Sequence, residues 1–296
     1  MDYRNKGYIR FVVAASITIT IFVFLFQRIP FASVFSLIKQ VDLKVLAICL
    51  MISFIKNIFV AAYRWRLIIK VLGYEISLRE ILFIKLASDP IVDVLPFKTG
   101  EFSKIAYLKV NHNISYSKAL FSIVIGYLLN LVVMFICALV GSVFFLKNKI
   151  MVNQDLQLVF GLSLFEKAKK RFKSYDFNLI RRVVCNKSIL IYTFLFIGIG
   201  LVNFYLLSVA LGNPLPLVNI LVFVPLVIVA SNMHVTISGL GIREFVVLFC
   251  FSGIGTPEFL LSLGLLYSFI DSLFFVIIGL PFTALFINRT FTDRGK

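Results

Sequence analysis

The sequence has little charge and few of the residues that most enzymes use. Charged residues make up 15% of the 296 positions, well below the roughly 25% usual in soluble domains. It has two histidines and none of the usual signatures of phosphate-binding loops, serine hydrolases or zinc proteases. The four cysteines form no Cys-x-x-Cys pair. These absences argue against a soluble fold and against zinc chemistry, and we predict no catalytic residue, no cofactor and no metal site.

Acidic residues are scarcer than basic ones. The chain has 14 Asp+Glu against 30 Lys+Arg, which gives a formal net charge of +16. In a soluble protein this balance would suggest a nucleic-acid partner. Here the basic residues mostly lie between apolar runs, as expected beside anionic lipid headgroups. We therefore expect a membrane, and no nucleic acid, as the partner.

Hydrophobic sequence is abundant. Hydrophobic residues make up 60% of the chain, and the mean hydropathy is +0.99. A membrane-spanning helix needs about 20 apolar residues. Six runs approach that length: 9–26, 45–63, 119–146, 189–211, 215–233 and 259–287. Because no long polar block separates two cores, we predict an all-α, polytopic transmembrane bundle that forms one integral membrane domain, residues 1–296.

Two further apolar regions are interrupted by charges, proline and glycine. The first, residues 81–110, contains Asp89, Asp93, Pro96, Lys98, Gly100, Glu101 and Lys104. The second, residues 234–255, contains Gly239, Gly241, Arg243 and Glu244. Irregular backbone at membrane depth is tolerated only where protein or a wet cavity covers it. We therefore expect two broken or re-entrant segments. If each crosses once, the bundle has about eight membrane segments.

The two broken segments share a pattern. Leu95–Glu101 and Ile237–Glu244 each contain a glycine break, a base and a following glutamate. Interrupted segments at corresponding places in two halves indicate an inverted repeat of the kind found in transporters. Two short matches also arise by chance, so the repeat is one of two interpretations.

The distribution of basic residues predicts the topology. The loop 147–188 carries ten Lys and Arg against three acids, and we place it in the cytoplasm. Both termini are also basic and are expected there, so the number of crossings is even. The predicted location is the cell membrane, with a multi-pass topology.

Several charges fall inside apolar segments. A charge at the bilayer centre costs about 2.5–3.5 kcal/mol even on lenient insertion scales. The acids concerned are Asp89, Asp93, Glu101, Glu244 and Asp271, and the base is Arg243. One interpretation is structural ion pairing, for example of Arg243 with Glu101 or Glu244. The other is a polar cavity that binds a charged headgroup, and the two overlap because paired charges can line a site.

The glycine break near Gly239 and Gly241 adds a second argument. A helix that starts near Ile242 would direct unpaired N–H groups and a positive dipole end inward. Lys98 and Lys104, together with Arg243, would add charge-assisted contacts to a phosphate. The alternative is a simple glycine hinge between two apolar helices.

Arg64-Trp65-Arg66 follows the second apolar run. Snorkelling arginines beside an aromatic ring are typical of an interfacial anchor. Binding of a lipid headgroup by Arg64 and Arg66 is the alternative interpretation.

Taken in order, Arg64-Trp65-Arg66, then Leu95-Pro96 with Gly100-Glu101, then Gly239-Leu240-Gly241-Ile242-Arg243-Glu244 resemble a known family. The resemblance is to the flippase-like membrane domain of lysylphosphatidylglycerol synthases and covers about residues 10–287. Lys98 and Lys104 stand where that family usually has arginine, and His234 stands where it has proline. The soluble aminoacyl-transfer domain of the synthases is not seen in this chain. The resemblance implies binding or movement of an anionic lipid, either a phospholipid or a polyprenyl-phosphate-linked molecule.

Three functions follow as hypotheses. The first is a lipid flippase or transporter, in which Glu101, Glu244 and Asp271 orient the bases or bind a coupling proton. The second is a membrane-embedded transferase in lipid or glycan modification, with Glu101 or Asp271 as the base. The third is an accessory subunit that docks on a lipid-modifying enzyme through residues 147–188. A homo-oligomer is compatible with each of them.

Overall fold

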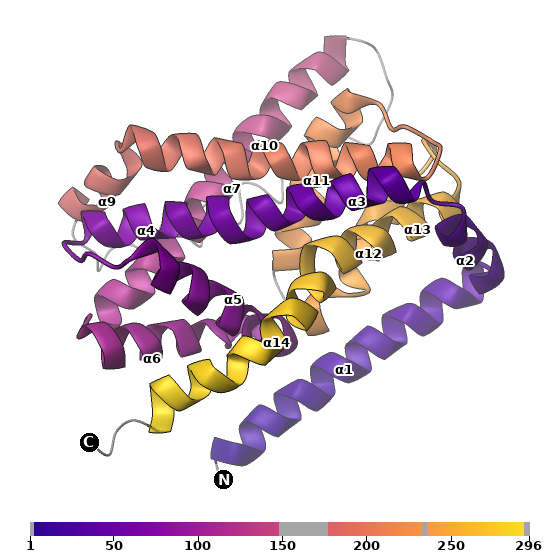
Figure 1. Ribbon diagram of the computed structural model, residues 1–296. Coiled ribbons are helices and arrows are strands. Elements are labelled where there is room, and N and C mark those ends of the chain that lie inside the picture. Colours follow the sequence, from indigo (N-terminus) through magenta and orange to yellow (C-terminus); the bar gives the residue numbers. More distant parts are fainter. Residues whose placement is uncertain (1–2, 148–176, 233–235, 293–296) are drawn as a thin grey trace.

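A computed structural model describes residues 3–147, 177–232 and 236–292. Every regular element in these ranges is a helix, so the all-α prediction is confirmed (Figure 1). The elements are α1 (Tyr3–Arg28), α2 (Phe31–Lys39), α3 (Leu43–Phe54), η1 (Ile55–Val60), α4 (Ala61–Val71), α5 (Leu78–Val94), η2 (Pro96–Lys98), α6 (Glu101–His112), α7 (Tyr116–Lys147), α9 (Phe177–Val184), α10 (Lys187–Ala210), α11 (Leu217–Asn232), η4 (Ile237–Gly239), α12 (Ile242–Cys250), α13 (Pro257–Ser268), η5 (Phe269–Leu273), α14 (Phe274–Ile287) and η6 (Asn288–Thr292).

Four continuous helical stretches are long and apolar enough to cross a bilayer: Leu43–Val71, Tyr116–Val143, Lys187–Ala210 and Pro257–Thr290. A fifth candidate is the pair α1 and α2, which bend by 92° at Pro30. The chain is therefore a multi-pass membrane protein. The described residues supply at most five such spans rather than about eight, because α11 has only 16 residues and the interrupted regions fold differently.

The span that begins at Leu43 runs further than the sequence predicts. Asp42 caps its start by accepting from the backbone N–H of Lys44 at 2.8 Å. No glycine or proline lies between residues 43 and 71, so the helix continues through Arg64-Trp65-Arg66 to Val71. The cluster is therefore inside a helix and not beyond its end.

The long helices have alternating directions. α3–α4 and α10 are antiparallel, because Asp42 N–H donates to Ala210 O at 2.9 Å while the rings of Tyr63 and Tyr192 lie 4.7 Å apart. α3–α4 and α7 are also antiparallel, since Arg64 contacts Asn130 and the Lys118 ammonium lies 3.3 Å from the Tyr74 hydroxyl. It follows that α7 and α10 point the same way.

The shared direction of α7 and α10 limits how the basic loop 147–188 can connect them. Lys147 ends α7 and Lys187 begins α10, so the two attachment points lie at opposite ends of the bundle. Residues 148–176 lie outside the described residues. The prediction that the whole loop is cytoplasmic stays a prediction, and it has to account for attachment points at opposite ends.

The first interrupted region folds as an antiparallel helix pair, α5 and α6, joined through η2. Lys104 lies 3.6 Å from Asp89, and further along α6 the Tyr107 hydroxyl lies 3.0 Å from Glu80. The partner number on α5 falls as the number on α6 rises, so the chain turns back on itself. α6 has 12 residues and is about 18 Å long, which is too short for a hydrocarbon core of about 30 Å.

The second interrupted region repeats this arrangement with α11 and α12, joined through η4. The Nε of Arg243 lies 2.8 Å from the Ser231 hydroxyl, and the rings of Phe251 and Phe223 are 5.4 Å apart. The helices are again antiparallel. α12 has nine residues. We call α5–η2–α6 the first hairpin and α11–η4–α12 the second hairpin.

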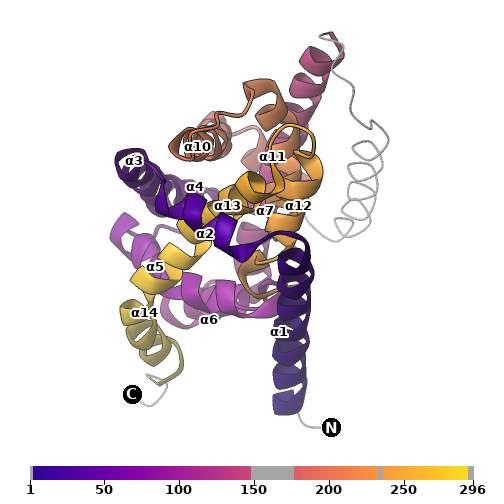
Figure 2. The ribbon, with the colours of Figure 1, turned by 90° about the vertical axis from the view of Figure 1, so that its right-hand side faces the viewer.

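The hairpins enter from opposite ends of the bundle and meet inside it. The first follows α4 and the second follows α10, and these helices end at opposite ends. At the tips, the Lys98 ammonium donates to the Asn232 side chain at 2.8 Å, and η4 packs on α5. α1 stands at the edge of the bundle in both views (Figures 1 and 2). It reaches the second tip through Thr18, whose hydroxyl accepts from the Ile237 N–H at 3.2 Å.

Candidate functional site

A polar cavity of about 220 Å³ lies where the two hairpins meet the long helices. Its lining comes from both hairpins and from α4, η1, α7, α10, α13, η5 and α14. The basic lining residues are Lys56, Arg64, Lys85, Lys98, Lys104 and Arg243, and the acidic ones are Asp89, Asp93, Glu101 and Asp271. Six bases against four acids leave a formal surplus of two positive charges.

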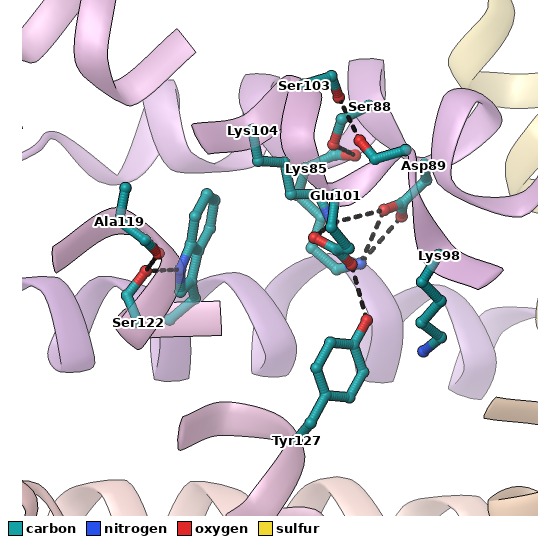
Figure 3. Close-up of polar contacts among 12 residues, drawn as sticks. Lys85, Ser88, Asp89, Lys98, Glu101, Ser103, Lys104, Ala119, Ser122 and Tyr127 are labelled. Carbon is teal, nitrogen blue, oxygen red and sulfur yellow. Dashed lines mark hydrogen bonds and ion pairs between the residues drawn. The ribbon is translucent and has the colours of Figure 1, made fainter. Parts of the chain in front are cut away.

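One part of the lining is a network of paired charges on the first hairpin (Figure 3). The Lys85 ammonium lies 2.9 Å from Asp89, one helical turn away. The Lys104 ammonium lies 3.6 Å from Asp89 and 3.2 Å from Glu101, and the Tyr127 hydroxyl donates to Glu101 at 2.7 Å. We call Lys85, Asp89, Glu101 and Lys104 the paired cluster. Two positive and two negative charges balance each other within it.

A second part of the lining is positive and takes no part in the ion pairs of the described residues. Among the residues that the structure describes, no carboxylate lies within ion-pair distance of Arg64, Lys98 or Arg243. We call these three residues the unpaired cations. Buried charges are usually paired, because the cost of removing an ion from water is several kcal/mol. Three such cations around one cavity give this cavity the chemistry to attract an anion.

Each unpaired cation is held by neutral groups. Arg64 is 8% exposed, donates to the Asn130 side chain and stacks over Phe196, while its Nε has no partner among the described residues. The Lys98 ammonium lies 4.0 Å from the centre of the Tyr127 ring, and Figure 3 draws it beside the paired cluster without a contact to it. Both side chains are positioned and remain able to donate.

Arg243 is the most buried of the three, at 3% exposed. Its Nε and Nη2 donate to the hydroxyls of Ser231 and Ser272 at 2.8 and 3.2 Å. Its Nη1 has no partner among the described residues, although the side chain lines the cavity. A guanidinium that lacks a carboxylate and keeps a vacant donor is suited to bind a phosphate oxygen.

A separate ion pair joins the two spans that carry π-helical turns. Lys56 in η1 contacts Asp271 in η5, and the Asn57 amide also donates to Asp271, at 3.2 Å. π-helical turns often occur at functional sites. The Lys56 ammonium and the Arg64 guanidinium lie over the same ring, Phe196, so a paired and an unpaired cation are neighbours.

The structure brings most of the predicted site residues together. The bases Lys98, Lys104, Arg243 and Arg64 and the acids Glu101, Asp271, Asp89 and Asp93 all line the cavity. The expected ion pair of Arg243 with Glu101 or Glu244 does not form among the described residues.

Two of the ten charged residues predicted for the site lie outside the cavity lining, as do the four predicted break residues. Arg66 donates to the backbone oxygen of Ile76 at 2.9 Å, on another face of α4. Glu244 is fully buried, accepts from the Gly241 N–H at 2.6 Å and from the Ser268 hydroxyl at 2.5 Å, and faces α13. Glu244 therefore caps α12, and the expected vacant N–H groups at that helix start are partly occupied by its carboxylate.

The backbone breaks at the tips of the two hairpins depend on different properties of their proline and glycine residues. Pro96 begins η2, and Gly100 precedes α6 with an ordinary φ of −60°. A Cβ at Gly100 would collide with the backbone of Ile91, so this glycine permits close packing in the hairpin. Gly239 and Gly241 have φ of 72° and 86°, a left-handed conformation that favours glycine.

Sequence reasoning missed several lining residues. Lys56 and Asn130 lie within runs that are otherwise apolar, and Lys85 lies at the start of the first interrupted region. A single lysine inside the run 45–63 is itself a signal, because intramembrane ionisable residues are rare and mark functional sites. Ser231 and Ser272 give no such signal.

A larger, shallow groove of about 480 Å³ lies along α1 and is a weaker candidate. Its lining comes from one helix, between Thr18 and Gln27, and contains no charged residue. A surface of this kind is expected wherever an apolar helix faces lipid. The central cavity is therefore the candidate site.

Comparison with known proteins agrees with this description. The family model "Lysylphosphatidylglycerol synthase TM region" matches residues 9–168, more than half of the chain. The match includes Arg64 and the first hairpin, and it ends before the second hairpin. No curated protein gives a significant match. With a matching family model, a bundle of apolar helices and a polar cavity between two hairpins, the chain belongs to the family of the transmembrane region of lysylphosphatidylglycerol synthases.

Proposed function

We propose that this protein is a lipid flippase or transporter that binds the anionic headgroup of a membrane lipid in the central cavity. The headgroup belongs to a phospholipid or to a polyprenyl-phosphate-linked lipid. The proposal places the protein in the cell membrane with both termini in the cytoplasm. The family membership supports a lipid-related role in the membrane.

The observation that carries the proposal is the set of unpaired cations. Arg64, Lys98 and Arg243 line one cavity, are fixed by amide, hydroxyl or aromatic groups, and lack acidic partners among the described residues. A phosphate would supply the missing negative charge and accept hydrogen bonds from the vacant donors of Arg64 and Arg243. A hydrogen bond to a charged group contributes about 1.5–3 kcal/mol.

The helix arrangement supports movement of the bound lipid. Each half contains a long helix, a hairpin and a second long helix: α3–α4, α5–α6 and α7, then α10, α11–α12 and α13–α14. We propose that these halves are an inverted repeat and that the hairpins are re-entrant. Transporters with such repeats bind substrate at the midplane, where broken helices meet, and expose it by rocking one half against the other.

The direct test is lipid movement in vesicles. Purified protein is reconstituted into phosphatidylcholine vesicles that contain a trace of NBD-labelled phosphatidylglycerol, phosphatidylserine or a polyprenyl phosphate, and the label in the outer leaflet is bleached with dithionite. We expect faster transbilayer movement of at least one anionic lipid than in protein-free vesicles, and a strong loss with Arg243→Gln. Unchanged movement of every lipid by folded protein would count against the proposal.

Arg66→Gln is a matched control for Arg64→Gln. Both change one arginine on α4, but only Arg64 lines the cavity. Transport that falls equally in both variants would indicate loss of fold rather than loss of a headgroup contact. Formation of a covalent product from donor and acceptor lipids by the purified protein would support the transferase alternative instead.

A further inference from the structure

We infer that the cavity moves an anionic lipid together with one proton, and that Asp271 is the proton site. The inference rests on the proposed function and adds an energy source to it. It begins from the Lys56–Asp271 pair, which joins η1 to η5 at the cavity wall. No other ion pair among the described residues connects these two spans.

Each member of the pair has an unpaired cation near it. Lys56 shares the Phe196 ring with Arg64. Asp271 is followed by Ser272, whose hydroxyl accepts from Arg243. Lys56, Arg64 and Arg243 also line the same cavity. In this proposal a phosphate bound there competes with Asp271 for the Lys56 ammonium group.

The other groups around Asp271 define its alternatives. Asn57 donates to it from η1, and Tyr267 and Arg243 interact with it electrostatically from α13 and α12. The Ser53 hydroxyl donates to the backbone oxygen of Ile270, the residue before Asp271. The Asp271 carboxylate itself accepts from Lys56 and Asn57. Asp271 has Lys56 as its only ion-pair partner among the described residues, so displacement of Lys56 leaves a partly buried carboxylate, 21% exposed, without one.

A carboxylate that is largely removed from water and loses its counter-ion is driven to take up a proton. In the empty cavity Asp271 is an anion paired with the Lys56 cation. When the headgroup phosphate replaces Asp271 as the ion-pair partner of Lys56, one Asp271 oxygen binds one proton from the solvent. The carboxyl group then becomes neutral. One negative charge and one proton enter together, so the charge of the cavity is the same in both states.

The paired cluster does not offer the same switch. Each lysine of that cluster has a carboxylate within three or four residues on its own helix, Lys85 with Asp89 and Lys104 with Glu101. These contacts move with the hairpin as a unit. Lys56 and Asp271 are 215 residues apart in sequence and lie on different spans. Opening their contact loosens one half of the bundle from the other.

The first experiment measures proton uptake by the wild-type protein. Phosphatidylglycerol is added to protein in weakly buffered detergent, and lipid binding and pH change are recorded together. We expect about one proton per lipid bound. Binding without proton uptake would overturn this inference and leave the proposed function intact, whereas absence of binding to any anionic lipid would overturn both.

The second experiment applies a pH gradient across vesicles that contain a trace of NBD-labelled phosphatidylglycerol. Coupling of one lipid to one proton predicts that a gradient of one pH unit concentrates the label about tenfold in the alkaline leaflet, whatever the membrane potential. NBD-labelled phosphatidylcholine should not respond. Label that moves with the potential and ignores the pH gradient would contradict the inference.

Variants assign the site. Asp271→Asn should remove the proton uptake that accompanies lipid binding and the response to the gradient. The double variant Lys56→Gln/Asp271→Asn carries no charge at this point, and its proton uptake per lipid bound tests the same assignment if the single variant fails to fold. Glu75→Gln removes an exposed surface acid and should behave as wild type. Gradient-driven accumulation that persists in a folded Asp271→Asn protein would place the proton elsewhere.

Discussion

The two hairpins have the same shape but are stabilised by different chemistry. The first carries the paired cluster, in which two lysines neutralise two carboxylates. The second carries Arg243 and Glu244, which are adjacent in sequence and do not pair with each other. Glu244 caps its own helix, and Arg243 donates to hydroxyls. The paired cluster of the first hairpin balances its own charge, and Lys98 at the tip of that hairpin stands apart from it, whereas the second hairpin brings only the unpaired cation Arg243 to the cavity lining.

This difference separates structural charges from available ones. A cation with a carboxylate partner resists an incoming phosphate, because binding must first break an existing ion pair. A cation held by hydroxyls and amides has no ion pair to break, although Glu101 and Asp93 act on Lys98 and Asp271 acts on Arg243 at longer range. We therefore expect substitutions in the paired cluster to affect stability first, and substitutions of the unpaired cations to affect ligand binding first.

The largest expected effect is the side of the membrane from which each hairpin end can be labelled. This result is all-or-none. Single cysteines are placed at four exposed loop positions in a Cys185→Ser background: Glu75, Ser115, Asn213 and Ser252. Because each hairpin returns to the end from which it started, residues 75 and 115 should react with a membrane-impermeant thiol reagent from one side, and residues 213 and 252 from the other.

The same cysteine scan distinguishes a hairpin that turns back from a segment that crosses the membrane. If α5–α6 crossed the membrane once, residues 75 and 115 would react from opposite sides, and the comparison of two matching hairpins would fail. Right-side-out and inside-out vesicles provide the two orientations. The wild-type protein, which keeps the exposed Cys185, serves as a positive control for labelling.

The next effect is on stability. Lys104→Met leaves Glu101 and Asp89 with one fewer cation, and breaking a buried ion pair costs about 3–5 kcal/mol. Arg243→Met removes a cation whose hydrogen-bond partners among the described residues are two hydroxyls, so the expected loss is smaller, about 1 kcal/mol per neutral hydrogen bond. Thermal unfolding in detergent measures both. Equal loss in the two variants would contradict the distinction between the hairpins.

A third prediction concerns the affinity for anionic lipid. Arg64→Gln should weaken phosphatidylglycerol binding about tenfold or more, since a charge-assisted contact contributes about 1.5–3 kcal/mol. Lys85→Gln, in the paired cluster, should change affinity less. Binding is measured at two salt concentrations in detergent. The Arg66→Gln protein gives the baseline, and a similar loss in all three variants would remove the distinction.

The smallest expected effect concerns the glycines of the breaks. Gly241→Ala places a Cβ in a left-handed conformation and within 3.1 Å of Ile21, and should cost at least the 1–2 kcal/mol roughly expected for φ alone. Gly73 has a similar φ of 89° with open space around it, so Gly73→Ala isolates the backbone term. Chemical or thermal unfolding of the two variants measures the difference. If Gly73→Ala costs as much as Gly241→Ala, the close approach of α1 contributes nothing.

Some of the site follows from the sequence alone. Asp89, Glu101, Lys98 and Arg243 stand out because charge is expensive in an apolar segment. Lys56 was missed although it obeys the same rule, because a single lysine does not interrupt a long apolar run. Glu244 was assigned to the cavity because a charge pattern gives no direction for a side chain, and its capping bond to Gly241 depends on where α12 begins.

The number of times the chain crosses the membrane is harder to predict from the sequence. Hydropathy has the same value for a helix that crosses and for a helix that turns back. Whether residues 81–110 and 234–255 cross depends on contacts such as Tyr107 with Glu80 and Phe251 with Phe223, which join residues far apart in sequence. The expectation of about eight segments therefore exceeded the number of spans in the described part of the chain.

The sequence by itself determined that the chain is a helical membrane protein and where its two breaks lie, because apolar run length, proline and glycine act locally. Only the tertiary structure decided which charges are paired. Lys56 and Asp271 meet across 215 residues, while Arg243 and Glu244, which are neighbours, do not. Pairing depends on distances in space, and sequence order alone does not give these distances.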